Sequence, residues 1–397
     1  MDDHTQRMQG NLRTLTLLQA MRGAGFFLPV WVIFLLNQNL NFTQILILQT
    51  ALACTIAAWQ LPSGHFSDRR GRRITLIIAS LCDFLAVLTY CLGTSFWSFL
   101  LGHILFATGL SFASGTIEAL AYESLVEGGG DPKDFRRTMG RLSFAKLGAE
   151  AAAAIATIGI VALGLRATFW LTLITYGIGL LLTLTLEEPR KHQIEEAPPP
   201  ERLLAVCVQT IKNSAMRSLM LLETVLTALG LLLYWFTQPL LTEIGIPLRF
   251  FGLLHAGIVF GGALAGLSVH AFERWIPDWI FYSALSVAIV GSYILLGSFV
   301  APFAITFFFI VRISWGFLTP LTSDLLTRLA PPASRATVLS LRGLTFQLLY
   351  APFPPLLGIV ADRTTLGTAL LTAGIGGGAI AVLLLVSMRG VWGKIPS

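Results

Sequence analysis

Charged residues are scarce in this sequence, and their scarcity excludes most classes of protein. Only 12% of the 397 residues are Asp, Glu, Lys or Arg, whereas 55% are hydrophobic. A soluble chain of this length would carry about 25% charged residues. With a mean hydropathy of +0.74, the chain lacks the polar side chains needed to cover a water-facing surface. Disorder is excluded as well, because a disordered chain needs low hydrophobicity and high charge.

Signatures of metal sites, disulfides and enzymes are also missing. The four cysteines form no C-x-x-C pair, and the six histidines show no metal-ligand spacing. The sequence has no phosphate-binding loop, no H-E-x-x-H, no G-x-S-x-G and no paired aspartate-rich motif for magnesium and a diphosphate. We therefore expect no cofactor, no metal and no enzyme activity.

What the sequence has instead is a series of long apolar runs. A transmembrane helix needs about 20 predominantly apolar residues to cross about 30 Å of hydrocarbon. The runs are continuous and not alternating, which predicts helices rather than barrel strands. We therefore predict an all-α integral membrane fold with 12 transmembrane helices. The predicted spans are residues 14–36, 44–62, 74–93, 97–124, 140–163, 167–186, 216–241, 250–271, 279–299, 302–326, 336–360 and 367–388.

The distribution of basic residues predicts the orientation of these spans. Of the 27 Lys and Arg residues, 20 precede the first span, follow an even-numbered span or lie in the C-terminal tail, counting Arg141 and Arg217, which are the second residues of the next spans. The loops after odd-numbered spans hold only Arg166, Arg249 and Arg363. This bias predicts a protein of the cytoplasmic (inner) membrane with both termini in the cytoplasm. The net charge of +6 thus reports topology, and we expect no nucleic-acid partner.

One polar interruption divides the chain into two halves. Residues 187–214 combine mixed charge with three consecutive prolines, which predicts a cytoplasmic linker with one short helix. On either side lie an N-terminal six-helix bundle, residues 1–186, and a C-terminal six-helix bundle, residues 215–397. Six plus six spans is typical of transporters built from repeats, whose site lies between the halves near the bilayer midplane.

The loop predicted after the second span carries a specific motif, GHFSDRRGRR, over residues 64–73. It resembles the G-x-x-x-D-R-x-G-R-[RK] signature of the major facilitator superfamily, at the place where that family carries it. The resemblance implies a cytoplasmic latch in which Asp68 and Arg72 pair with an acidic residue at the cytoplasmic end of the fourth span, here Glu123. The alternative is that the four arginines are only topology signals. The residues of the implied latch are Gly64, Asp68, Arg69, Gly71, Arg72 and Arg73 of the motif, with Glu123 of the fourth span.

Other stretches extend the resemblance over essentially the whole chain. GTIEALAYESL, LAPPASRATVLSL and LLGIVADRTTLG are similar to segments of a little-characterised prokaryotic branch of the superfamily. Two departures weaken the expectation of a drug antiporter. The fifth span lacks the Gly-Pro motif of those proteins, and the fourth lacks their Arg-x-x-x-Gly motif.

Ionisable residues within the spans are the candidates for coupling. Placing each of them in the membrane costs at least about 2.5 kcal/mol, so by default the residue faces a cavity, forms an ion pair or has a direct function. The resemblance implies that spans 1, 4, 7 and 10 line the central cavity. Desolvation favours the protonated form of a carboxylate and a nearby arginine opposes it, so proton binding can depend on whether a pair is intact. The candidates for proton or substrate coupling are Arg22, Glu118, Glu150, Glu223 and Arg312.

Structural roles compete with each of these interpretations. Lys146 and Glu150 are four residues apart and can neutralise each other, and Asp83 lies in a span that is peripheral in the family, which favours a structural pair. Glu118 has no cation within four residues on its own helix, so we take it as the first candidate for the proton.

Aromatic and amide side chains predict the nature of the solute. Gln60, Trp315 and Gln347 lie within the spans and suit an amphipathic organic solute, although Trp also gathers at membrane interfaces. We expect a secondary active transporter that works by alternating access, with proton-coupled export of a small organic, amphipathic or drug-like solute as the first choice. The alternatives are an uncoupled facilitator, a proton-coupled uptake permease for a metabolite, or a transport-inactive receptor or scaffold. The expected partners are a small molecule, protons and the lipid bilayer, and the family implies a monomer.

Overall fold

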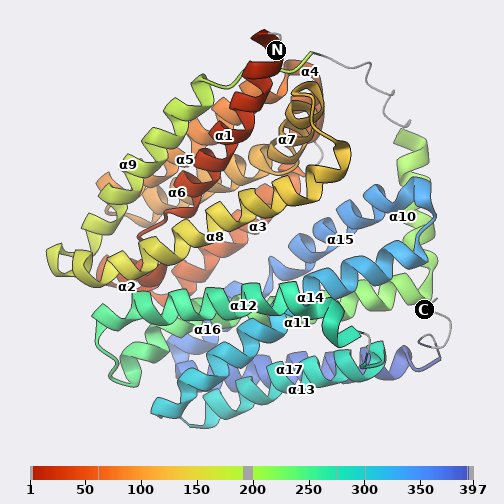
Figure 1. Ribbon diagram of the computed structural model, residues 1–397. Coiled ribbons are helices and arrows are strands. Elements are labelled where there is room, and N and C mark those ends of the chain that lie inside the picture. The colour runs from red at the N-terminus through yellow and green to blue at the C-terminus, as the bar shows by residue number, and fades with distance from the viewer. Residues whose placement is uncertain are drawn as a thin grey trace. The chain divides into compact units, whose positions relative to one another are not determined.

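The computed structural model describes residues 3–60, 62–190, 200–273, 275–299, 301–390 and 392. Throughout these residues the regular secondary structure is helical (Figure 1). Twelve helical regions are long and apolar enough to cross a membrane. The predicted fold class, all-α with 12 spans, is confirmed.

The first six spans contain nine α-helices. They are α1 (Asp3–Gly23), α2 (Trp31–Asn37), α3 (Phe42–Trp59), α4 (Pro62–Arg70), α5 (Arg72–Leu92), α6 (Phe96–Ala113), α7 (Thr116–Glu127), α8 (Phe135–Ile160) and α9 (Leu165–Leu184). Short 3-10 turns join some of them: η1 (Leu28–Val30), η2 (Pro132–Asp134) and η3 (Val161–Leu163).

The remaining helices begin within the predicted linker. They are α10 (Pro200–Lys212), α11 (Ser214–Glu243), α12 (Phe251–Glu273), α13 (Asp278–Ser298), α14 (Ile305–Leu329), α15 (Arg335–Tyr350), α16 (Phe353–Arg363) and α17 (Leu366–Ser387), with turns η4 (Leu248–Phe250), η5 (Pro302–Ala304) and η6 (Pro332–Ser334). Helix α10 is the short helix expected between the halves. Residues 191–199 of that linker lie outside the described residues.

Two of the confirmed spans contain a break that the sequence analysis did not indicate. The first span stops at Gly23 and resumes at η1, and the fourth stops at Ala113 and resumes at Thr116. Gly115 adopts φ +76° between α6 and α7, a conformation that favours glycine. The eleventh span is also divided, between α15 and α16, beside Pro352, Pro354 and Pro355.

The motif after the second span is also not the loop that we expected. Residues 62–70 form helix α4, and Gly71, at φ +101°, turns the chain directly into α5. Gly71 therefore makes the turn between the two helices. Gly64 does not provide a close approach, because a Cβ built there would meet no atom within 4 Å.

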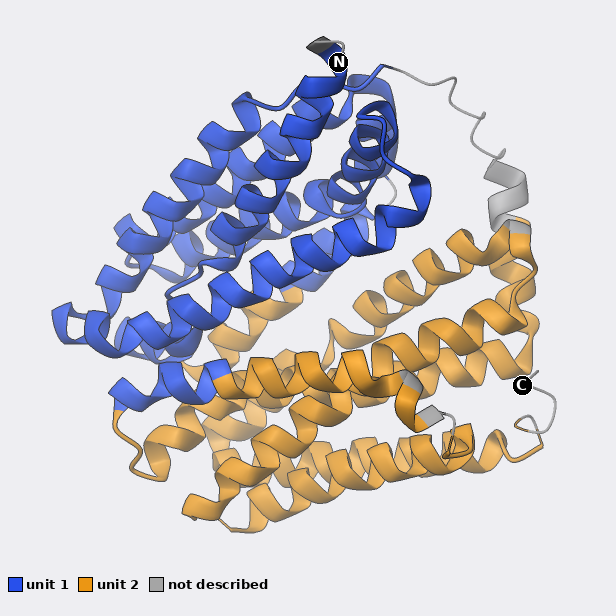
Figure 2. Ribbon diagram, in the orientation of Figure 1, with its two compact units in different colours: residues 1–40, 51–196, 248–256 blue, residues 41–50, 197–247, 257–397 orange. Residues whose placement is uncertain are grey.

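The helices cluster into two compact units (Figure 2). Unit 1 contains residues 1–40, 51–196 and 248–256, and unit 2 contains residues 41–50, 197–247 and 257–397. Unit 1 is mainly the N-terminal part of the chain and unit 2 mainly the C-terminal part. Two segments are exceptions: the start of α3, residues 41–50, belongs to unit 2, and the η4–α12 junction, residues 248–256, belongs to unit 1. Asp362 contributes to placing the start of α3 in unit 2, because its carboxylate accepts bonds from the backbone N–H groups of Phe42 at 3.0 Å and Thr43 at 2.8 Å.

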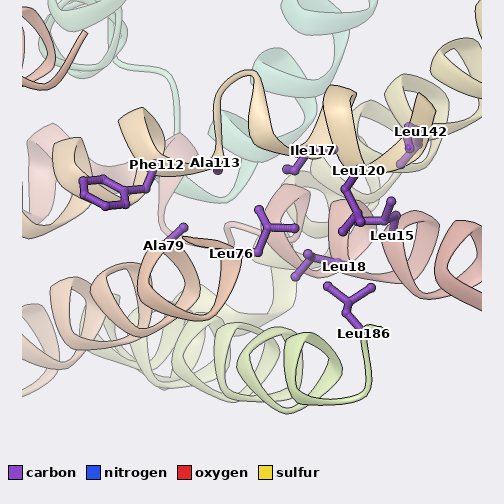
Figure 3. Packing of buried hydrophobic residues seen from close by; sticks show 11 residues of the cluster. Leu15, Leu18, Leu76, Ala79, Phe112, Ala113, Ile117, Leu120, Leu142 and Leu186 are labelled. Atoms are coloured by element: carbon purple, nitrogen blue, oxygen red, sulfur yellow. The ribbon is translucent and has the colours of Figure 1, made fainter. Parts of the chain in front are cut away.

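Unit 1 has an apolar core where α1, α5, α6, α7 and α8 meet (Figure 3). Leu15 and Leu18 of α1, Leu76 of α5 and Leu120 of α7 are completely buried in it. Because lipid is as apolar as leucine, these helices associate through close packing rather than through exclusion of water. This core holds the helices that carry the ionisable side chains described next.

Candidate functional site

The break in the first span is supported by side chains of two neighbouring helices. The N–H of Phe26 donates to Thr172 Oγ1 at 3.0 Å, and its carbonyl accepts from Thr157 Oγ1 at 2.9 Å. Thr175 Oγ1 donates to the carbonyl of Ala24 at 3.2 Å. Backbone groups freed at membrane depth must find partners within the protein, because hydrocarbon offers none. Threonines of α8 and α9 thus stabilise the break.

A pocket of about 170 Å³ lies beside this break, within unit 1. Its polar lining combines two cationic and two acidic side chains with one tyrosine. The lining residues are Arg22, Gly23, Leu28, Asp83, Phe106, Leu110, Lys146, Glu150 and Tyr176. Of the sequence candidates, the structure therefore brings Arg22 and Glu150 together. Asp83 and Lys146, which sequence reasoning had assigned to structural pairs, line the same pocket.

Arg22 and Asp83 form a buried ion pair at this pocket. Arg22 Nη1 lies 2.6 Å from Asp83 Oδ2, and the two side chains are only 10% and 4% exposed. Gly109 of α6 faces Asp83, and a Cβ at that position would collide with the carboxylate. The glycine therefore makes room for a charged group between helices, where charges are otherwise costly.

A second acidic group at the pocket has a histidine partner. Glu150 Oε1 of α8 lies 3.4 Å from Nε2 of His255, which belongs to the first turns of α12. The His255 side chain is 8% exposed. No sequence signal indicates this contact, because the two residues are 105 positions apart. The pocket and its surroundings thus hold two carboxylates, two cations and an imidazole.

Unit 2 has its own buried ion pair. Arg342 of α15 binds Glu223 of α11 through two contacts, Nε–Oε2 at 2.9 Å and Nη2–Oε1 at 2.5 Å, and donates to Ser323 Oγ at 2.7 Å. Asp324 of α14 pairs with Arg328 at 2.5 Å along its own helix. Arg342 points to Glu223, whose side chain is 4% exposed.

Two further candidates in unit 2 contact each other. The guanidinium of Arg312 lies 4.5 Å from the ring centroid of Trp315, in a cation–π arrangement. Both belong to α14, and small residues of neighbouring helices accommodate them: Gly262 of α12 packs against Arg312 and Gly230 of α11 against Trp315. Gln347 lies on α15 and is half-buried.

Two unit 1 candidates are not part of the pocket. Glu118 lies in the first turn of α7 and is exposed. Among the described residues it makes no ion pair. Its role as proton carrier stays a prediction. Gln60 is half-buried at the junction of α3 and α4.

The motif residues at the end of the second span form a compact set of contacts. Arg72 Nη1 lies 2.6 Å from Asp68 Oδ1 and donates to Ser67 Oγ at 3.0 Å, and its Nε donates to Glu123 Oε1 at 3.3 Å. Arg72 therefore joins α4, α5 and α7, as the family resemblance implies. Whether these contacts act as a latch stays a prediction. Arg73 donates to the carbonyl of Leu184, whereas Arg69 is exposed.

Sequence reasoning missed a carboxylate next to this motif. Glu188, just after α9, accepts from the backbone N–H groups of Arg72 at 2.7 Å and Arg73 at 2.8 Å. It thereby caps the N-terminus of α5, where free N–H groups and the helix dipole favour an anion. The only sequence signal was the acidic pair Glu187–Glu188 directly after an apolar span.

Comparison with known proteins identifies the family. The family model for the Major Facilitator Superfamily matches residues 15–351. The chain belongs to the major facilitator superfamily. A curated relative, the uncharacterized MFS-type transporter YxaM of Bacillus subtilis (strain 168), is 30% identical over 108 residues. That match spans about a quarter of the relative's length, 25% of each chain.

Solved structures share this fold over nearly the whole chain. A variant of the nucleoside transporter NupG superposes with a TM-score of 0.81 at 15% identity, covering 96% of this chain and all of that one. A POT family transporter in complex with 5-aminolevulinic acid gives 0.74 at 12%, covering 97% and 96%. A bacterial homolog of the human lysosomal transporter Spinster gives 0.72 at 17%, covering 98% and 97%. Family and fold are those of transporters and not of enzymes, which confirms that expectation.

Proposed function

We propose that this facilitator-superfamily protein is a secondary active transporter that exports a small organic, amphipathic solute in exchange for protons by alternating access. It acts in the cytoplasmic membrane, with both termini in the cytoplasm and the two six-helix halves, residues 1–186 and 215–397, moving against each other. The orientation rests on the bias of 20 basic residues against three.

The observation that carries proton coupling is the Arg22–Asp83 pair at the pocket beside the broken first span. A proton on Asp83 removes the negative charge that holds Arg22. The freed guanidinium then needs another partner, and Glu150 of the same pocket offers one. Proton binding is thereby linked to a rearrangement between α1, α5 and α8, which is what a coupled transporter requires.

The second half offers a similar arrangement. Glu223 and Arg342 join α11 to α15 through two contacts, so protonation of Glu223 would loosen that helix pair too. Glu118 and Arg312 complete the coupling set that we propose. Glu118 supplies an exposed carboxylate in the first turn of α7, and Arg312 a cation held over Trp315.

Support for an amphipathic solute comes from the half-buried aromatic and amide groups. Trp315, Gln347 and Gln60 are neither fully buried nor fully exposed, so they remain available to a solute with an apolar body and a few polar groups. Nucleosides and peptides belong in the test panel, because structural neighbours are named as nucleoside and peptide transporters.

The Asp68–Arg72–Glu123 contacts act, in this proposal, as a latch at the cytoplasmic ends of the helices.

Thermal unfolding of the detergent-purified protein against a compound panel tests this proposal. A solute that binds the folded state raises the unfolding midpoint. We expect at least one compound whose shift of the unfolding midpoint differs between mildly acidic and mildly alkaline pH. This pH effect should be lost in Asp83→Asn. The control variant Lys133→Gln, at the start of the α8 region, should behave as wild type.

Other outcomes point to the alternative functions. A hit that is independent of pH contradicts coupling and favours an uncoupled facilitator. The absence of any hit across the panel favours a receptor or scaffold. If Glu118→Gln keeps the full pH effect, Glu118 is not the proton carrier.

A further inference from the structure

A groove separate from all the sites above lies on unit 2, between the start of α13 and the end of α17. Its volume is about 770 Å³. The two helices pack against each other along their length, and both are candidate spans. The groove therefore follows the edge of a transmembrane helix pair.

The wall of this groove is apolar and open. Val382, Leu385 and Val386 of α17 line it, and Val382 and Val386 are 59% and 50% exposed. In a span, exposed aliphatic side chains of this kind contact acyl chains.

The end of the groove is polar and cationic. Arg389 lies two residues after the end of α17, and Trp279 is the second residue of α13, so both lie where the spans end. Trp392 is the third lining residue here, and its ring lies 5.6 Å from that of Tyr282. Tryptophan with arginine at a span end is the arrangement that suits the headgroup level of a bilayer.

Arg389 is available for an external anion. Its side chain makes no ion pair with any residue that the structure describes, and the residue is exposed. Ser283, deeper in the groove, donates its hydroxyl proton to the carbonyl of Trp279 at 2.7 Å. The proton of this hydroxyl is therefore already engaged and does not compete with Arg389 for an anion.

We propose that this groove binds an anionic glycerophospholipid of the cytoplasmic leaflet. The phosphate lies at Arg389 between the two tryptophans, and an acyl chain follows the valine and leucine wall. Charge selects the anionic lipid, since a zwitterionic headgroup brings its own cation to the arginine. The leaflet is the one that the positive-inside bias assigns to the ends of even-numbered spans.

Lipid titration with native mass spectrometry tests this proposal. The purified full chain is titrated with phosphatidylglycerol and with phosphatidylcholine, and bound lipid is counted. One arginine near an anionic surface predicts a preference of about fivefold for phosphatidylglycerol. Arg389→Gln should remove the preference, whereas Arg141→Gln, which removes an exposed arginine of α8, should keep it.

Two further experiments show whether the signal comes from a lipid bound along the groove or from phosphate binding alone. Val386→Trp fills the acyl wall and should reduce the binding of both lipids. Inorganic phosphate at the same concentration should not displace phosphatidylglycerol. Equal binding of the two lipids, an unchanged preference in Arg389→Gln, or displacement by inorganic phosphate would each overturn the proposal. None of these readouts depends on transport, so the lipid site stands or falls apart from the proposed function.

Discussion

Asp83 and Arg22 illustrate how much a single buried side chain depends on its partner. Removing one member of a buried ion pair leaves the other charge uncompensated and costs about 3–5 kcal/mol. Glu150 of the same pocket can compensate Arg22 in part, although it already contacts His255. We therefore expect Asp83→Asn to lower the unfolding midpoint in detergent, by less than the full cost of a lone buried charge. The Arg22→Gln/Asp83→Asn double variant should recover most of the loss, because no lone charge remains. A double variant no more stable than Asp83→Asn would contradict the pairing.

Two ion pairs of unit 2 give a matched comparison of buried and half-exposed partners. Glu223 is 4% exposed beside Arg342, whereas Asp324 and Arg328 are 33% and 35% exposed. Half-exposed pairs contribute about 0–1 kcal/mol. Glu223→Gln should therefore lower the unfolding midpoint far more than Asp324→Asn, when both are measured in the same detergent. Equal effects would mean that Glu223 is not held by Arg342 in solution.

At this scale the sequence identified the ionisable residues but not their partners. Scarcity alone singled out Arg22, Asp83 and Glu150, because charges in apolar runs are conspicuous. Their pairing depends on how each helix is rotated and where it breaks, which no spacing within one span records. The contact between Glu150 and His255 is of this kind, and so is the capping role of Glu188.

Helix α5 owes its start to a residue from another element. Glu188 accepts the N–H groups of both Arg72 and Arg73, and losing a cap costs about 0.5–2 kcal/mol. Glu188→Ala should therefore speed amide hydrogen exchange in the first turn of α5, as measured by mass spectrometry. Glu187→Ala is the control, because Glu187 is 46% exposed and its side chain reaches Arg7 instead. Similar exchange in the two variants would show that Glu188 does not cap α5.

Hydropathy located every span but could not see the breaks within them. The count of 12 spans followed from apolar runs of sufficient length, and it is confirmed. The break at Gly115 depends on a backbone conformation that favours glycine. The break at Gly23 depends on backbone groups that other helices satisfy, because the N–H of Phe26 donates to Thr172 Oγ1 and its carbonyl accepts from Thr157 Oγ1. Apolar content does not report such bonds. In the sequence, only the prolines of the eleventh span indicate a break in a helix.

For the whole molecule, family membership and fold are the firm results, and the direction of transport and its coupling form the central proposal. The family model covers residues 15–351, and the structural neighbours match over 96% or more of the chain. Because those neighbours are at most 17% identical, they share the fold and say nothing of the solute. The proposal for coupling rests instead on the pocket beside α1 and its ion pair.

Solute flux in proteoliposomes under an imposed proton gradient tests this central claim most directly. The purified chain is reconstituted into vesicles loaded with a solute that stabilised the protein in the thermal-unfolding panel. Movement of the solute is followed with the proton gradient imposed in either direction or collapsed by a protonophore. We predict movement against the solute's own gradient, opposite to the proton flow, and its loss in Asp83→Asn with equal protein incorporation. Flux that is the same with and without the proton gradient would contradict proton-coupled export.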